Sequence, residues 1–527
     1  MAQTLVCVLF ASALLLCRAD AIILDRTHES RVFQETRNYR IFLPPDYEAS
    51  AKRYPVIYWF HGHSERSNIG PANKEYDRGN DYGGDNIANF VAHNDVIVVK
   101  WDGYNPRTPN EIYPRPYNIG PVETDRQFPI YFPELVAFID ANYRTIADRE
   151  HRATAGLSMG GFMSYWIAGK YPDLVSSASN FMGSSEFVVG PREFPVEYRH
   201  EEMRNNYRGV RTRLITGTQD FIQFYHRQMN LIWDMREHES ENFDSGHGTP
   251  GMAKTLAFHM NAFANPLPRP EIWSHADVYP NFSVWEWTVE TDRKHPGFTS
   301  IRSVSPTGFN SSVQEWLPGG KTLRYTHLKI TTGPSYPKNL QVPVTAIRLR
   351  DNFIHRERLL SDSQGRLHID LDGDEYQVRI GSGLVRRSIE TRPIAPAFIT
   401  TDFQIADHRS FQVFHHAIEK QTETLGEGNG DGKANHGEQI VILLPDGDAF
   451  RAAELFSDSD CIDLTNRVSD SWEKYDWVGA SAKYTVAKIN CGPGRVIKLK
   501  ARVVIPNKPN HQVREATIQL RIMFPDF

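Results

Sequence analysis

Two patterns of hydrophobic and polar residues divide the chain. Between residues 38 and 265, short runs of β-branched and aromatic residues alternate with longer amphipathic stretches. The runs expected to form strands are 38–46, 55–62, 95–101, 152–158 and 212–220, and the expected helices include 132–144 and 162–172. Apolar strands separated by helices are typical of a buried, mostly parallel sheet with helices on both faces. This half is therefore predicted to be an α/β domain.

The pattern changes after a proline-bearing stretch at 264–273, which we interpret as a linker because its prolines would interrupt a helix. Beyond it the period becomes two, which is typical of antiparallel strands. The expected strands are 283–291, 327–333, 345–351, 366–373, 376–381, 439–445, 494–506 and 515–524. The chain is thus predicted to hold an α/β domain at 22–265, a β-rich domain at 266–392 and a β-sandwich domain at 393–527. Whether 273–527 is one β domain or two stays open.

The first residues indicate export. Residues 2–17 are apolar and uncharged, and Ala19-Asp20-Ala21 is a small-residue cleavage pattern. We expect residues 1–21 to be a signal peptide and the mature protein to be secreted, extracellular or periplasmic. An uncleaved anchor is the alternative. No other apolar run approaches 18 residues, so no further span is expected.

Composition narrows the functional classes. The 527 residues carry 59 basic and 64 acidic side chains, a net charge of −5, without a long basic run. A nucleic-acid or anionic-membrane partner is therefore not expected. Two of the four cysteines lie in the signal segment, and Cys461 and Cys491 remain. In an oxidising compartment these two would form one disulfide, although two buried free thiols would also fit.

One short motif indicates a catalytic serine. Residues 156–161 read Gly-Leu-Ser-Met-Gly-Gly, which is G-x-S-x-G between an expected strand and an expected helix. The glycines permit a sharp turn that lifts the Ser158 hydroxyl above the sheet. The following helix N-terminus then faces a developing oxyanion with partial positive charge. Ser158 is the candidate nucleophile.

A serine hydroxyl needs a base, and the base needs an orienting carboxylate. Asp220 follows the strand at 212–220, and His247 lies on a glycine-flanked loop before an expected helix. We predict these two as the acid and the base. Asp244 is the second candidate acid and His238 the second candidate base.

Tetrahedral intermediates also need two backbone donors. The Met159 amide, directly after the nucleophile, is predicted to supply one, and the amide of Gly62 or His63 the other. Aromatic residues close to strand ends can stack on a sugar or an aromatic acyl group, although such residues are more often core. The weak candidates for this contact are Trp101, Tyr104, Phe181 and Phe221.

These motifs, together with RNYRIFLPPDY, the WFHG strand exit, GTQD and the GHG loop in that order, resemble the esterase D-like family of α/β hydrolases. That family includes feruloyl and acetylxylan esterases. The resemblance covers about residues 35–265 and implies an α/β-hydrolase fold and a serine esterase that needs no metal for catalysis. It leaves the ester open. The histidine loop departs from the family, since Thr249-Pro250 stands where many relatives have an aromatic residue.

A loop near the C-terminal strands has the spacing of a calcium site. Oxygen donors fall at positions 1, 3, 5, 7, 9 and 12 of an EF-hand-type register with a glycine at position 6. The residues are Glu427, Asn429, Asp431, Lys433 (through its carbonyl), Asn435 and Glu438. A β-strand is expected after this loop instead of a helix, so a structural calcium ion and a solvated turn both remain open.

The sequence as a whole predicts a secreted serine esterase that works through an acyl-enzyme. Polysaccharide-linked feruloyl or acetyl esters are the expected substrates, and the β-rich region is expected to be an accessory module. The alternatives are a serine peptidase or acyltransferase on the same fold, and a surface-binding protein with an inert hydrolase domain.

Overall fold

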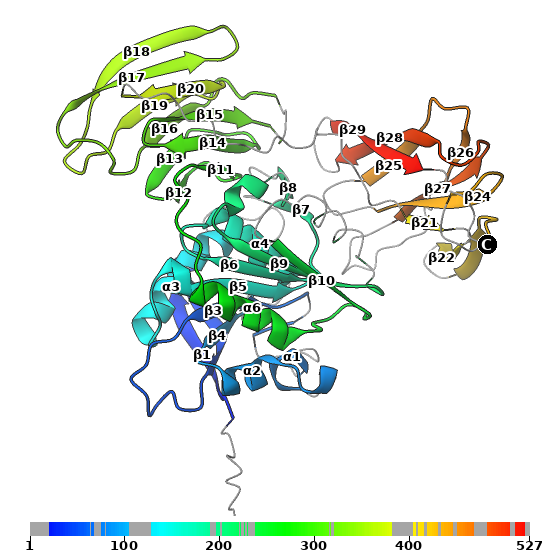
Figure 1. Cartoon of the computed structure of the whole chain (residues 1–527), viewed down its shortest axis with the longest axis horizontal. Coiled ribbons are helices and arrows are strands. Elements are labelled where there is room, and N and C mark those ends of the chain that lie inside the picture. The colour runs from blue at the N-terminus through cyan, green and yellow to red at the C-terminus, as the bar shows by residue number, and fades with distance from the viewer. Residues whose placement is uncertain are drawn as a thin grey trace, which may run out of the picture.

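The structure is a computed structural model of the whole chain (Figure 1). It describes residues 20–63, 65–67, 75–79, 81–104, 128–189, 196–200, 203–220, 222, 226, 229, 238–315, 317, 321–381, 404–406, 409–415, 419–429, 434–445, 451–467, 482–505 and 512–521. The predicted signal peptide lies outside this part of the chain except for its last two residues, and β1 begins directly after them at Ile22. Within the described residues, no helix is both long and apolar enough to cross a membrane.

An eight-stranded sheet forms the centre of the N-terminal region, in the order β1-β2-β4-β3-β5-β6-β9-β10. The strands are β1 (Ile22–Ser30), β2 (Glu35–Leu43), β3 (Val56–Phe60), β4 (Ile97–Trp101), β5 (Arg152–Leu157), β6 (Ser177–Phe181), β9 (Arg211–Gly217) and β10 (His238–Phe243). From β4 to β10 all neighbours are parallel, whereas β1 and β2 add an antiparallel edge. The mostly parallel sheet predicted from the sequence is confirmed.

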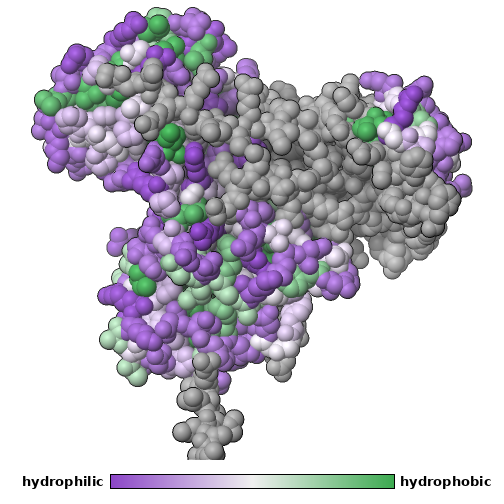
Figure 2. Space-filling view, in the orientation of Figure 1, coloured by the Kyte–Doolittle hydropathy of each residue, from purple (hydrophilic) through white to green (hydrophobic). Residues whose placement is uncertain are grey.

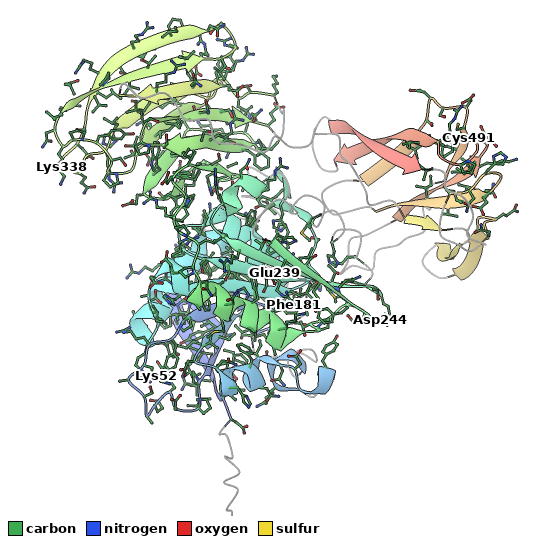
Figure 3. All side chains as sticks on the ribbon, viewed as in Figure 1. Lys52, Phe181, Glu239, Asp244, Lys338 and Cys491 are labelled. Atoms are coloured by element: carbon green, nitrogen blue, oxygen red, sulfur yellow. The ribbon has the colours of Figure 1, made fainter. Side chains whose placement is uncertain are left out.

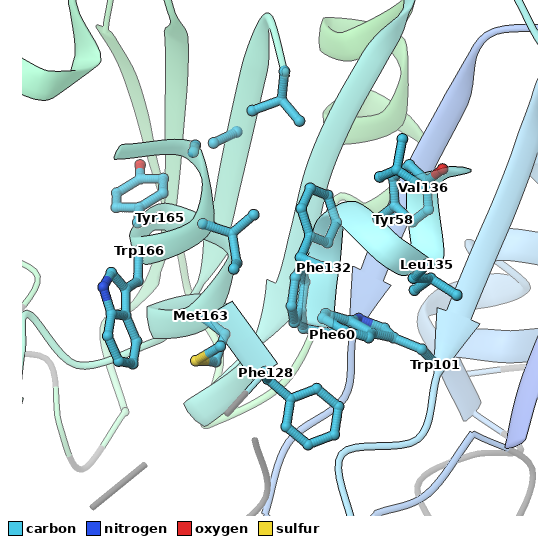
Figure 4. Close-up of a cluster of buried hydrophobic side chains, with 14 of the residues drawn as sticks. Tyr58, Phe60, Trp101, Phe128, Phe132, Leu135, Val136, Met163, Tyr165 and Trp166 are labelled. Atoms are coloured by element: carbon cyan, nitrogen blue, oxygen red, sulfur yellow. The ribbon is translucent and has the colours of Figure 1, made fainter. Parts of the chain in front are cut away.

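Helices cover both faces of this sheet because its central strands are apolar on both sides. One face packs on α3 (Phe128–Asn142) and α4 (Met159–Lys170), and Figure 4 shows part of that core. The other face packs on α2 (Ile87–His93) and α6 (Met252–Ala264). Alternate residues of β3 serve the two cores, since Tyr58 lies in the first and Trp59 in the second.

Two antiparallel sheets follow and share one core. The first has the order β11-β14-β15-β20-β17-β18 and the second β12-β13-β16-β19. Their bounds are β11 (Trp273–Asp277), β12 (Phe282–Val284), β13 (Trp287–Thr291), β14 (Phe298–Ser305), β15 (Gly308–Gln314), β16 (His327–Thr331), β17 (Gln341–Arg348), β18 (Phe353–Leu360), β19 (His368–Asp372) and β20 (Tyr376–Ile380). The β17–β18 hairpin lies far from the N-terminal region and carries exposed apolar side chains (Figures 1 and 2), among them Leu349, Phe353 and Ile354.

One expected strand was wrong in its extent. Residues 283–291 are a hairpin, with β12 paired to β13 through Val284 and Trp287. The two residues between them, Trp285 and Glu286, have φ of 50° and 68°. A two-residue hairpin turn with positive φ at both positions is the type I′ geometry, which usually takes Asn and Gly. Local sequence signals therefore did not reveal this turn.

The C-terminal strands form a separate core. The sheets are β21-β24-β27-β26, β22-β23 and β25-β28-β29. Their strands are β21 (Gln404–Ala406), β22 (Arg409–His415), β23 (Glu419–Leu425), β24 (Gln439–Pro445), β25 (Arg451–Phe456), β26 (Ile462–Arg467), β27 (Ala482–Ile489), β28 (Val496–Ile505) and β29 (Gln512–Arg521). The predicted Cys461–Cys491 disulfide is not formed in the structure, where both cysteines are free thiols. The two thiols are nevertheless close enough to interact, and a hydrogen bond with Cys491 lowers the pKa of Cys461.

Candidate active site

The nucleophile turn has the strained backbone that its sequence implies. Ser158 stands between β5 and α4 with φ 57° and ψ −118°, and its N–H donates to the Phe181 carbonyl at 2.8 Å. A non-glycine residue with positive φ is uncommon, and such strain gathers at functional sites. The turn also needs close backbone approach, since a Cβ on Gly160 would lie 2.1 Å from the Phe60 carbonyl oxygen. Glycine is therefore required at position 160.

The predicted acid and base are joined in the structure. His247 Nδ1 lies 3.0 and 3.2 Å from the two carboxylate oxygens of Asp220. Asp220 is 1% exposed and also accepts the Ile222 N–H at 2.9 Å. A histidine whose Nδ1 donates to a buried carboxylate presents Nε2 for proton transfer.

The second candidates lie elsewhere. Asp244 follows β10 (Figure 3), is exposed, and accepts hydrogen bonds from Thr218 at 2.9 Å and Gln219 at 3.0 Å. These two hydrogen bonds lower the pKa of Asp244. His238 begins β10 beside Thr212, whereas Asp220 follows the carboxyl end of β9. In parallel sheets, ligand-facing groups collect at the carboxyl ends of the strands. The geometry thus favours Asp220 and His247 over both alternatives.

The histidine loop contacts the residue that follows β6, the strand next to β5. Ser158 follows β5 and His247 follows β10, with β6 and β9 between these strands. The next residue, Gly248, donates its N–H to the Met182 sulfur at 3.1 Å, and Met182 directly follows β6, the neighbour of β5. A Cβ on Gly248 would lie 2.5 Å from the Tyr82 hydroxyl oxygen. Met182 and Tyr82 therefore border this loop, and neither belongs to a recognisable motif in the sequence.

His226 is a second histidine whose charge interacts with Asp220 and His247. His226 is 1% exposed, and burial lowers its pKa to about 4, while the Asp220 carboxylate opposes this shift. The charge of His247 lowers the pKa of His226 further. A neutral His226 leaves the Asp220 carboxylate to His247.

The predicted oxyanion donors flank the nucleophile. Met159 is the first residue of α4, where helix N–H groups have no intrahelical partner. Gly62 follows β3, and a Cβ on it would lie 3.6 Å from the Ser158 Cβ. Its N–H, however, donates to Glu65 Oε2 at 2.9 Å, a contact that the sequence did not suggest.

The aromatic candidates for substrate contact are core residues. Trp101 and Phe181 are fully buried and belong to the cores on opposite faces of the sheet. Tyr104 is 2% exposed and stacks on His61, with ring centroids 5.9 Å apart. Phe221 lies outside the described residues. Contact between a substrate and the three buried rings is therefore not supported.

The calcium motif is only partly visible. Asp431 and Lys433 lie outside the described residues, and Glu427 pairs with Gln439 through a backbone bridge. The Glu438 carboxylate accepts the N–H groups of Asn429 and Asn435 at 3.0 and 3.1 Å. Among the residues that the structure describes, no group of three or more His, Cys, Asp or Glu side chains is placed to hold a metal ion.

Comparison with known proteins finds esterases that are similar to the N-terminal region. Residues 30–256 match the family described as "Putative esterase". Two curated relatives from strains of Mycobacterium tuberculosis, Esterase MT1326 and Esterase Rv1288, are 34% identical over 145 residues. The aligned part is 27% of this chain and 28% of the length of each relative. The resemblance to esterases expected from the sequence is confirmed for this region.

Solved structures of esterases are also similar to a part of this chain. A ferulic acid esterase is 21% identical with a TM-score of 0.37, covering 46% of this chain and 98% of its own. The S-formylglutathione hydrolase FrmB from Staphylococcus aureus is 13% identical with a TM-score of 0.37, covering 47% and 100%. A ferulic acid esterase from Anaeromyces mucronatus, solved with ferulic acid, is 18% identical with a TM-score of 0.36, covering 47% and 92%.

Proposed function

We propose that this chain is a secreted serine carboxylic-ester hydrolase. The observation that carries the proposal is the His247–Asp220 hydrogen bond, on the same sheet as the strained Ser158 turn. The family match at residues 30–256 supports it independently. Polysaccharide-linked acyl esters, feruloyl or acetyl, are the substrates we propose, because export favours extracellular polymers and two relatives in the structural comparison are ferulic acid esterases.

The proposed mechanism uses two nucleophilic substitutions at one carbonyl. Ser158 Oγ attacks the ester carbonyl while His247 Nε2 takes its proton, and the tetrahedral oxyanion is held by the Met159 amide and a second backbone donor. His247 then protonates the leaving alcohol as the acyl-enzyme forms. Water repeats the sequence with His247 as base and releases the acid and Ser158. Asp220 holds the imidazole in the required tautomer throughout.

Replacing the nucleophile tests this proposal. We expect Ser158→Ala to lower kcat for p-nitrophenyl acetate by about 10⁴-fold or more, because no other group can carry the acyl intermediate. The melting temperature should fall little, since the methyl group fits the same turn. Steady-state hydrolysis and a thermal melt of both proteins measure this.

A labelling experiment separates the proposal from its competitors. A fluorophosphonate probe should label the wild-type chain and not Ser158→Ala. Labelling together with cleavage of peptides or acyl transfer in preference to ester hydrolysis would indicate a peptidase or an acyltransferase. An unlabelled wild-type chain would contradict the proposal and favour an inert hydrolase domain on a binding protein.

A further inference from the structure

The loop after β3 lies directly against the nucleophile turn. A Cβ on Gly62 would contact both the Ser158 Cβ at 3.6 Å and the Leu157 carbonyl at 3.5 Å. The orientation of the peptide bond between Gly62 and His63 therefore decides what this loop presents to the Ser158 side chain.

Two donors fix the carbonyl of that peptide bond. His61 Nδ1 lies 2.8 Å from the Gly62 carbonyl oxygen, and the Glu65 N–H lies 3.4 Å from it. His61 Nε2 accepts the Gly103 N–H at 2.8 Å, so the ring proton is on Nδ1 and donates to the Gly62 oxygen. Because burial lowers the pKa of His61 to about 3, the ring stays neutral at working pH and this tautomer persists.

Peptide planarity carries the constraint to the next residue. In a trans peptide the N–H points away from the carbonyl to which it is joined. With the Gly62 oxygen held toward His61 and the Glu65 amide, the His63 N–H points in the opposite direction. Of the two predicted second donors, Gly62 already gives its N–H to Glu65. The His63 amide, whose direction this peptide bond sets, is the other predicted donor.

Glu65 makes two hydrogen bonds with Gly62. Its carboxylate accepts the Gly62 N–H at 2.9 Å, and its own N–H completes the turn to the Gly62 oxygen. A glutamate that reaches back three residues to a backbone N–H is half of a capping box, a device that fixes the first peptides of a turn. The side chain is 6% exposed, so water competes little for the contact.

We propose that Glu65 is a positioning residue that directs the His63 N–H toward the oxyanion formed at Ser158. The proposal rests on the proposed esterase function. In this role Glu65 acts through the Gly62 N–H, which its carboxylate holds at 2.9 Å. An alternative role is purely electrostatic, since the Glu65 charge also acts on the buried Lys100 ammonium.

Two conservative variants show whether the length of the Glu65 side chain or its charge is what matters. Glu65→Gln removes the charge but keeps an oxygen at the same distance along the side chain, so it can still accept the Gly62 N–H. Glu65→Asp keeps the charge but is one methylene shorter and cannot span the same turn. We expect Glu65→Gln to stay within about threefold of wild-type kcat. Glu65→Asp should lose about 10- to 100-fold, less than the 10²- to 10³-fold loss typical when an oxyanion donor is removed outright.

The readouts are chosen so that a general loss of stability cannot imitate this result. The loss in Glu65→Asp should fall on kcat for p-nitrophenyl acetate with KM within about twofold. The Ki of a trifluoromethyl ketone, whose hemiketal oxyanion occupies the same hole, should rise by the same factor as kcat/KM falls. Thermal melts check folding, and Glu65→Ser, another side chain too short to reach Gly62, replaces Glu65→Asp if that variant does not fold.

The outcomes separate this proposal from the one on which it rests. An aspartate variant as active as wild type, or a glutamine variant impaired as strongly as the aspartate variant, overturns the role of Glu65. Ser158→Ala is assayed in parallel. Hydrolysis that survives Ser158→Ala overturns the esterase proposal itself. If hydrolysis depends on Ser158, the Glu65 variants test the role of Glu65 alone.

Discussion

The side chains of the candidate site differ in how strongly their surroundings constrain them. Asp220 is buried, receives a backbone N–H and faces His247, whereas Asp244 is exposed and is bonded to Thr218 and Gln219. Both carboxylates follow a strand of the same sheet, so position in the sequence does not separate them. Burial and hydrogen bonding do separate them, because Asp220 and not Asp244 is bonded to the His247 ring.

This difference gives a matched pair of substitutions. Asp220→Asn should lower kcat for p-nitrophenyl acetate by about 10⁴-fold, because an amide that donates toward Nδ1 favours the wrong histidine tautomer. Asp244→Asn should change kcat less than twofold. Steady-state kinetics of the two variants at pH 7 measures this. A loss in Asp244→Asn equal to that in Asp220→Asn would contradict the assignment of the acid.

A local motif made the position of Ser158 predictable, because short-range backbone geometry fixes it. The G-x-S-x-G string predicts a strand–turn–helix, and that is where Ser158 stands. Glu65 and Tyr82 could not be predicted in the same way. Their importance comes from contacts made in three dimensions, with the Gly62 amide and with Gly248, and no periodicity encodes such contacts.

At the scale of elements, α4 begins so close to the end of β3 that the approach requires a glycine, which has no side chain. A Cβ on Gly160 would lie 2.1 Å from the Phe60 carbonyl oxygen and 2.6 Å from that of His61. Both are backbone atoms, of the last residue of β3 and of the residue after it, and cannot rotate away as a side chain could. By contrast, a Cβ on Gly246 in the histidine loop would meet nothing within 4 Å.

We therefore expect alanine to act differently at the two glycines. Gly160→Ala should destabilise the fold by several kcal/mol, about 3 or more, since overpacking against backbone forces β3 and α4 apart. Gly246→Ala should be nearly neutral. Urea unfolding followed by circular dichroism compares the two. Equal stability of both variants would show that the turn can widen at little cost.

The strands expected from the sequence agree best with the structure where hydrophobic residues dominate the strand. The strands β3 and β4 are apolar except for Lys100 and were expected, whereas β6 was not. Its sequence, Ser-Ala-Ser-Asn-Phe, is mostly polar, yet every residue is buried. His259 of α6 bonds the hydroxyls of Ser177 and Ser179 at 2.9 Å each, so polarity inside the sheet is satisfied by a residue 80 positions away. Hydrophobic patterning cannot reveal a strand of this kind.

On the scale of the whole molecule, the first β-rich region, which begins with β11, packs into the core of the α/β region. Val278, Tyr279 and Phe298 lie in the same buried cluster as α3 and α4. The Trp285 N–H donates to Asp173 at 2.9 Å, and the Arg149 guanidinium lies over the Trp285 ring. The last residue of α4, Lys170, pairs with Asp277 of β11 at 2.5 Å, with both side chains at most 4% exposed. The nucleophile helix is thus anchored at its far end by the next region of the chain.

That buried ion pair gives a prediction about stability. Asp277→Asn leaves the Lys170 ammonium buried without its carboxylate and should lower the free energy of unfolding by about 3–5 kcal/mol. The nearby exposed pair Arg269–Glu286 provides the control. Glu286→Gln should have little effect, because exposed ion pairs contribute little. Urea unfolding at pH 7 measures both variants, and an equally small effect of Asp277→Asn would contradict the anchoring role.

The same pair has a pH signature. Burial raises the pKa of Asp277, but the Lys170 charge and the nearby His275 outweigh burial, so the folded-state pKa lies below the ordinary value of 3.8. A depressed carboxyl pKa stabilises the fold above the unfolded-state pKa, and that contribution is lost as the pH falls through the folded-state value. The stability difference between wild type and Asp277→Asn should therefore be constant from pH 7 to about pH 5 and shrink below about pH 4. Buried histidines such as His259, whose pKa burial lowers to about 3, weaken both proteins in acid alike and cancel in the difference. A difference that does not shrink at low pH would mean that Asp277 contributes through its hydrogen bonds and not through its charge.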